Sequence, residues 1–188
     1  SSVQAGTRAP DGRWFGSEPE LLADVRGDGV DALIEKIGSA IEVYPYARQY
    51  RVWPGPNSNT FTAFVMRSVP ELRVDLPATA VGKDYFGAGL VAPAPSGTGY
   101  QLSVLGLVGV LVALEEGLEL NVLGLTFGID PDHMSLKLPM AGRISLLWVA
   151  AVAMLLFAAK YGFRRCSRVR DSTQAENRSR PRSRASDR

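Results

Sequence analysis

The sequence predicts an α+β domain followed by a transmembrane helix and a basic tail. Three observations lead to this fold class. Apolar residues recur at helical spacing in 28–42 and again after Ser58. Apolar residues alternate with other residues over 100–129, as in antiparallel strands. The stretch 144–159 then has no charged residue at all.

The N-terminal part of the chain predicts two helices. Residues 1–16 are polar and contain glycine, so we expect an extended segment, and the start without Met leads us to expect a missing N-terminal portion. Residues 17–20 read Ser-Glu-Pro-Glu, which favours a short helix that stops at Gly27. Asp28 is expected to cap a second, amphipathic helix that ends before Pro45.

The segment Pro54-Gly-Pro-Asn-Ser-Asn-Thr-Phe61 follows a short extended stretch around Val52 and opens the next helix. Prolines bias the preceding residue away from the helical region, and Asn and Ser side chains cap helix starts. Ser58 therefore has two interpretations. It is either an ordinary helix cap or a nucleophile at a helix N-terminus, where backbone N–H groups favour developing negative charge.

Residues 100–129 predict a β-hairpin with one or both faces buried and a turn at 115–117, and residues 136–138 add a third strand. A membrane helix at 102–114 is the weaker alternative, because that run is short and holds two glycines. Lys83 and Asp84 are expected to form an ion pair on a surface loop. The α+β domain is thus expected to cover residues 17–140.

The stretch 144–163 predicts a single transmembrane helix, since about 20 mainly apolar residues span a bilayer. Trp148 and Tyr161 stand near its two ends, where interfacial aromatic residues are common. Residues 164–188 are rich in Arg and Ser and predict a disordered tail. Positive flanks stay in the cytoplasm, so we expect a cytoplasmic tail, a folded domain on the far side, and the lipid bilayer as a partner.

Composition narrows the chemistry. Residues 160–188 hold ten basic and three acidic residues, so they carry +7 and residues 1–159 carry −5 of the net +2. The basic tail directly follows the apolar run, which favours membrane anchoring over nucleic-acid binding. Cys166 is the single cysteine and His133 the single histidine. The sequence therefore predicts no disulfide within the chain, no multi-histidine metal site and no cofactor.

Three blocks carry a resemblance to known proteins: Trp53–Phe61, Leu76–Tyr85 and Leu123–Gly128. Together they resemble an uncharacterised bacterial membrane-associated family, the domain of unknown function numbered 3750, over about residues 9–145. More distantly, Asn57-Ser58-Asn59-Thr60-Phe61 is similar to the Asn-Cys-x-x-Phe block of circularly permuted papain-like (NlpC/P60-like) acyltransferases and peptidases. That likeness implies a helix packed on an antiparallel sheet, with the nucleophile at the start of the helix.

The papain-like resemblance places Ser58 at the nucleophile position, with Asn57 beside it. Two departures weaken this assignment: Ser replaces the more acidic Cys, and no His precedes Ser58 in the sequence. His133 follows two aspartates in a polar turn and is the remaining candidate base. We expect an inner-membrane, extracytoplasmic domain that, if active, hydrolyses or transfers amide or ester groups of an envelope substrate. The alternative is a non-catalytic binding or scaffolding domain.

Overall fold

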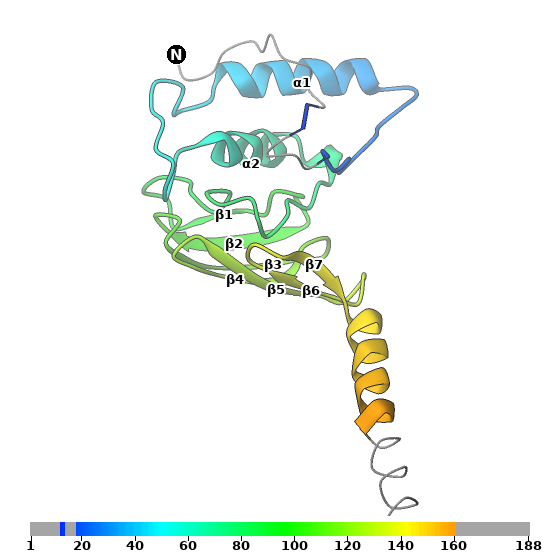
Figure 1. Ribbon diagram of the computed structural model, residues 1–188. Helices are drawn as coiled ribbons and strands as arrows, with labels where there is room; N and C mark the ends of the chain where they lie inside the picture. Colours follow the sequence, from blue (N-terminus) through cyan, green and yellow to red (C-terminus); the bar gives the residue numbers. More distant parts are fainter. Residues whose placement is uncertain (1–11, 14–17, 161–188) are drawn as a thin grey trace, which may run out of the picture. The chain divides into compact units, whose positions relative to one another are not determined.

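The computed structural model describes residues 12–13 and 18–160. The chain divides into two units, Ser1–Ser145 and Leu146–Arg188, and each is considered by itself. The first unit contains helices α1 (Val30–Glu42) and α2 (Ser58–Ser68), the short 3-10 helix η1 (Pro70–Leu72) and a seven-stranded sheet (Figure 1). The predicted α+β class is confirmed at this level.

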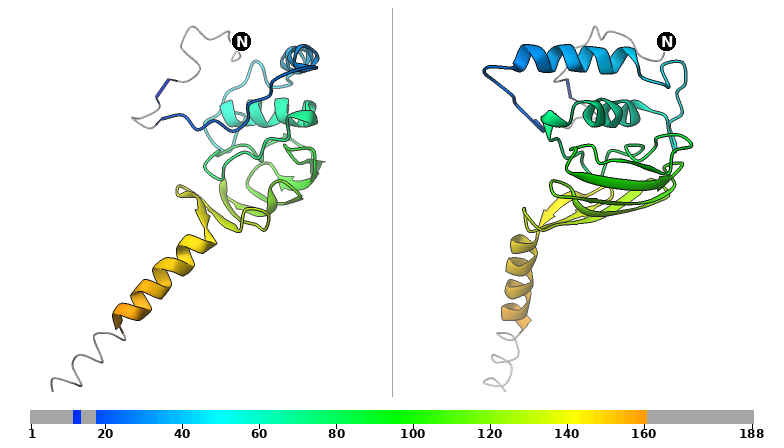
Figure 2. Two further views of the ribbon diagram at one scale, coloured as in Figure 1. Left: turned by 90° about the vertical axis from the view of Figure 1, so that its right-hand side faces the viewer. Right: turned by 180° about the vertical axis from the view of Figure 1, so that it is seen from behind.

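The two helices of the first unit form successive layers over one face of the sheet, with α2 between α1 and the strands (Figures 1 and 2). Helix α2 buries Ala63, which packs with Val74 and Leu76 in a small apolar core. Helix α1 is capped by Gly29, in a left-handed conformation with φ of 90° and without a side-chain hydrogen bond. The predicted cap at Asp28 is therefore wrong by one residue.

The sheet is a simple meander. Every strand pairs antiparallel with the next along the chain, in the order β1 to β7. The strands are β1 (Val91–Pro93), β2 (Gly99–Val104), β3 (Val108–Ala113), β4 (Gly117–Val122), β5 (Leu125–Asp130), β6 (Ser135–Leu138) and β7 (Gly142–Ser145). Such connections need only short turns, so neighbouring strands in sequence are neighbours in space.

The prediction of a single hairpin over 100–129 is only partly correct. Its turn between β3 and β4 is confirmed, but each expected long strand is folded into two. Leu105 and Leu123 adopt left-handed conformations, with φ of 53° and 55°, and each precedes a glycine that is also left-handed. Apolar side chains at these turns concealed them in the sequence, because turns are ordinarily recognised by polar residues.

The two faces of the sheet have opposite character, and they are the reverse of the usual arrangement. Antiparallel sheets normally bury apolar residues and expose polar ones. Here the face under α2 (the inner face) is polar and buried, with Gln101, Ser103, Glu119, Asn121, Thr126, Asp130, Ser135 and Lys137 each at most 3% exposed. The other face (the outer face) carries the apolar residues of the alternation and is exposed.

Two further expectations for the first unit are wrong. Residues 18–26 are not helical, and Leu21 is 78% exposed. A helix this short is marginal in water unless tertiary packing supports it, and Leu21 lacks that packing. The stretch around Val52 is a bend rather than a strand; its fold is held instead by a hydrogen bond from the Arg51 N–H to the Pro56 carbonyl at 2.7 Å.

The second unit is helical over residues 146–160. The first two residues of the predicted span of 144–163, Ile144 and Ser145, belong instead to β7, where they pair with β6. Residues 161–163 and the predicted tail at 164–188 lie outside the described residues, as does most of the N-terminal segment at 1–16. Among the helices that the structure describes, none has both the length and the apolar character needed to cross a membrane.

Candidate functional site

The start of α2 is a capping box built on Asn57. Its backbone is extended, and its side-chain oxygen accepts the Thr60 N–H at 3.0 Å. In return, the Thr60 hydroxyl oxygen accepts the Asn57 N–H at 3.0 Å. Asn57 is buried, whereas Ser58, the first helical residue, is exposed. The structure therefore assigns the cap to Asn57 and leaves Ser58 facing solvent.

Asn57 also ties the helix start to two loops. Its amide nitrogen donates to the Val52 and Val81 carbonyls, both at 2.9 Å, and Asn59 donates to the same Val81 oxygen. Gly82 follows with φ of +97°, and a Cβ there would stand 2.4 Å from the Asn57 amide nitrogen. The asparagines of the motif thus have a structural purpose, which is to hold the 81–82 loop against α2.

This end of α2 lies beside the turn between β4 and β5. The Trp53 indole donates to the Leu123 carbonyl at 3.0 Å. A Cβ on Gly124 would contact both that indole, at 3.0 Å, and the Val81 side chain, at 3.3 Å. The Ser58 region is therefore fastened to the end of the sheet where β5 begins.

His133 lies at the opposite end of β5, in the turn to β6. Its backbone N–H donates to Asp130 Oδ1 at 3.1 Å, and its Nδ1 is 2.8 Å from Asp130 Oδ2. Burial would raise the pKa of Asp130, but the hydrogen bonds from His133 outweigh it and lower that pKa. Strand β5 has six residues, so roughly 17 Å separates its ends. The structure does not bring Ser58 and His133 together.

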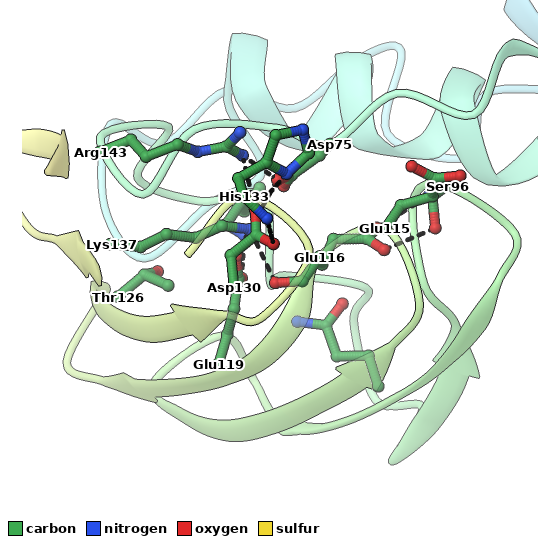
Figure 3. Close-up of polar contacts among 12 residues, drawn as sticks. Asp75, Ser96, Glu115, Glu116, Glu119, Thr126, Asp130, His133, Lys137 and Arg143 are labelled. Atoms are coloured by element: carbon green, nitrogen blue, oxygen red, sulfur yellow. Dashed lines mark hydrogen bonds and ion pairs between the residues drawn. The ribbon is translucent and has the colours of Figure 1, made fainter. Parts of the chain in front are cut away.

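Between these ends, the inner face holds a chain of buried ion pairs (Figure 3). Glu119 bridges two lysines: one carboxylate oxygen pairs with Lys83 and the other lies 2.8 Å from Lys137 Nζ. Lys137 also donates to Asp75 at 2.6 Å and to the Glu116 carbonyl at 2.8 Å. Burial disfavours a charged Lys83, yet the Glu119 and Asp84 carboxylates outweigh it and raise the pKa of Lys83.

A second polar group joins this chain from the α2 side. Arg67 donates to the Lys83 carbonyl at 3.0 Å and to the Gln101 side chain, and Gln101 donates to Asp84. Burial lowers the pKa of Arg67 to about 10 and raises that of Asp84. The predicted surface pair of Lys83 with Asp84 is therefore wrong: both residues are buried, and Lys83 pairs with Glu119. The polar residues that alternate along the strands were the only sequence signal for this buried polar cluster.

A polar pocket of about 320 Å³ opens at the His133 end of the sheet. Arg143 pairs with Asp75 there and lies 3.5 Å from Asp130. Asp75 Oδ1 is buried without a hydrogen-bond partner, and burial raises the pKa of this carboxyl group. The lining of the pocket also includes Arg73, Glu115 and residues 20–22. No group of three or more potential metal ligands occurs in the part of the chain that the structure describes.

The outer face presents a wide apolar surface that is exposed among the described residues of the first unit. Cross-strand pairing aligns its residues in apolar rows, such as Leu102–Val110–Leu120–Phe127 across β2 to β5. Twelve side chains on it are 40–71% exposed: Tyr100, Leu102, Val104, Val108, Val110, Val112, Leu118, Leu120, Val122, Leu125, Phe127 and Ile129. Exposed Leu105, Leu114, Leu123 and Met140 occupy the adjoining turns.

The exposed apolar area of this face is large for a monomer. Burying an apolar side chain gains about 1.5–3 kcal/mol at about 25 cal/mol per Å², which corresponds to roughly 60–120 Å² per side chain. These sixteen residues are on average about half exposed, so they present on the order of 700 Å². The largest apolar patch of a typical monomer is about 300–600 Å². A standard protein interface buries about 800 Å² per partner. The outer face therefore has the size of an interface.

Comparison with known proteins gives one match. The family model described as "Protein of unknown function (DUF3750)" matches residues 1–85. The chain is similar to that family over these residues. The match includes the Trp53–Phe61 and Leu76–Tyr85 blocks and ends before β1, so the Leu123–Gly128 block lies beyond it. No curated protein and no solved structure matches the chain. The relationship to papain-like enzymes remains a prediction.

Proposed function

We propose that this chain is a membrane-anchored protein of the bacterial envelope whose folded unit is a non-catalytic binding domain. The observation that carries the proposal is the exposed apolar outer face of the sheet, which has the area of an interface. The strands turn their charged residues inward, where Glu119 pairs with Lys83 and Lys137, so the rows of the outer face are apolar apart from the hydroxyl of Tyr100.

The geometry around Ser58 supports binding over catalysis. A serine nucleophile depends on a base within hydrogen-bond reach, typically about 2.6–3.2 Å. The single histidine of the sequence, His133, stands at the other end of β5. The conspicuous asparagines beside Ser58 are accounted for by the capping box and the loop contacts of Asn57 and Asn59.

Thiol accessibility tests whether the outer face is covered in the working protein. In a Cys166→Ser background, cysteine is introduced by Leu120→Cys on the outer face or by Val43→Cys at the end of α1, which is 68% exposed. In native membranes opened to the reagent, we expect a water-soluble maleimide to modify position 120 several-fold more slowly than position 43. Equal rates would show an open face and contradict the binding function.

The anchor is proposed to be the stretch 146–163, with the tail cytoplasmic and the folded unit on the other side. Removing 146–188 leaves β7 intact and is expected to move the protein to the soluble fraction. A truncated chain that stays with membranes after a carbonate wash would contradict a single anchor. Ready labelling of Cys166 in intact cells by an impermeant thiol reagent would reverse the orientation.

A second function, amide or ester hydrolysis or acyl transfer, has two observations in its favour. Ser58 is exposed at the first position of α2, where backbone N–H groups and the helix dipole favour an anionic intermediate. The helix over an antiparallel sheet also agrees with a permuted papain-like layout. We expect the purified chain to hydrolyse no peptide, ester or acyl substrate. Turnover that disappears in Ser58→Ala would establish this second function instead.

A further inference from the structure

We propose that the outer face binds the outer face of a second copy of this chain, so that two sheets pack into a sandwich dimer. The inference rests on the proposed binding function and names its partner. Antiparallel sheets that pack face to face lie about 10 Å apart, with their apolar side chains between them. A two-fold dimer of this kind uses the same patch on both subunits, so a patch without charge is complementary to itself.

The dimensions of the sheet favour a second sheet over a helix as the occupant. Seven strands at about 4.8 Å spacing make the sheet roughly 29 Å wide. One helix is about 10 Å in diameter, so a single apolar helix such as residues 146–160 would cover about two strands. A second copy presents a face of equal width and the same side chains, and covers all the rows at once.

Charge favours a second copy over an anionic lipid surface. Proteins that lie on such a surface use clusters of Lys and Arg. The rows of the outer face contain no charged residue, and the turn after β5 contributes the exposed Asp132. Residues 1–159 carry a net charge of −5. An uncharged face on a chain segment of net negative charge matches another apolar protein face better than an anionic bilayer.

The centre of the patch identifies the residues that would meet their counterparts. Strand β4 is the middle strand of the seven, and Leu120 lies on it between Val110 and Phe127. A two-fold axis through this centre would place Leu120 and Phe127 against the same region of the second copy. Both side chains are exposed in the single chain, at 46% and 43%.

Site-specific photo-cross-linking tests this arrangement with the full chain in native membranes. Phe127→p-benzoyl-phenylalanine places the probe at the centre of the face, and Tyr50→p-benzoyl-phenylalanine is the matched control, since Tyr50 is 59% exposed and lies before α2. We expect a covalent dimer of twice the 20.3 kDa chain from position 127 only. Adducts from 127 with lipid, with another protein or with residues 146–160 would overturn the dimer.

A charge substitution provides a second readout. Leu120→Glu is expected to abolish the cross-linked dimer from position 127, while Val43→Glu keeps it; circular dichroism checks that each variant retains its sheet. A dimer that persists in a folded Leu120→Glu chain would contradict the proposal. Slow maleimide modification at position 120 without a cross-linked dimer would also overturn it, yet would leave the binding function standing with another partner.

Discussion

The inner and outer faces of the sheet are built from the same strands but are stabilised by different physics. On β4, Glu119 and Asn121 point inward and are nearly inaccessible, whereas Leu118 and Leu120 point outward and are about half exposed. The inner face is stabilised by directional hydrogen bonds and ion pairs among polar and charged side chains. The outer face offers apolar area, which stabilises the protein only when another surface covers it and removes it from water.

The contrast shows how this sheet sets its register. A shift of one residue exchanges the two faces of a strand. For β4 such a shift would turn Glu119 to the outer face, so that buried Lys83 and Lys137 would both lose the carboxylate that they share. Burying an unpaired charge costs far more than exposing an apolar side chain. The polar inner face therefore specifies the pairing of the strands, and the apolar residues take the face that remains.

The largest effect is expected from the inner face. Glu119→Gln removes the carboxylate that two buried lysines share, and breaking a buried pair in this way costs about 3–5 kcal/mol of unfolding free energy. Chemical denaturation measures the loss. Glu115→Gln, at the adjacent turn, is the control and should change the free energy of unfolding by no more than about 0.5 kcal/mol. Similar values for the two variants would mean that the buried pairs do not stabilise the fold.

A smaller loss is expected where α2 is attached to the loops above the inner face. Asn57→Ala removes the helix cap together with the hydrogen bonds to Val52 and Val81. A lost cap costs about 0.5–2 kcal/mol, and we expect a value near the upper end. Thermal unfolding followed by circular dichroism measures it. A cost no greater than that of replacing a surface residue would contradict the capping box.

The inner face also predicts a pH dependence. Glu116 accepts hydrogen bonds from the Ser96 hydroxyl and, at 2.9 Å, from the Ser96 N–H; burial outweighs these bonds and raises the pKa of Glu116 above 4.5. The folded chain then binds this proton more tightly than the unfolded chain, so stability falls as pH rises from about 4.5 through the folded pKa. Unfolding titrations should show this fall in the wild type relative to Glu116→Gln. Parallel pH curves would contradict it.

The smallest effect is expected at Ser58, the exposed neighbour of Asn57. Ser58→Ala removes a hydroxyl from the surface without touching the cap, so the free energy of unfolding should change by no more than about 0.5 kcal/mol. Denaturation of Ser58→Ala beside Asn57→Ala makes this comparison. A cost for Ser58→Ala equal to that of Asn57→Ala would show that the hydroxyl is part of the helix cap.

Much of the fold was predictable from local patterns, whereas the contacts of the candidate site were not. Helical spacing located α1 and α2, and proline and asparagine located the start of α2, because these signals act within a few residues. The turns at Leu105 and Leu123 were not predicted, since apolar residues give no sign of a left-handed backbone. The burial of Lys83 was not predicted either, because its partner Glu119 is 36 residues away along the chain.

The sequence by itself determined the α+β class, the alternation of apolar and polar residues along the strands, and the separation between an acidic body and a basic tail. Only the tertiary structure decided which side of that alternation faces inward. Periodicity shows that a strand has two faces, but it does not say which one is covered. That choice followed from Lys83, Asp75 and Arg67, which lie outside the strands and find their partners on the polar face.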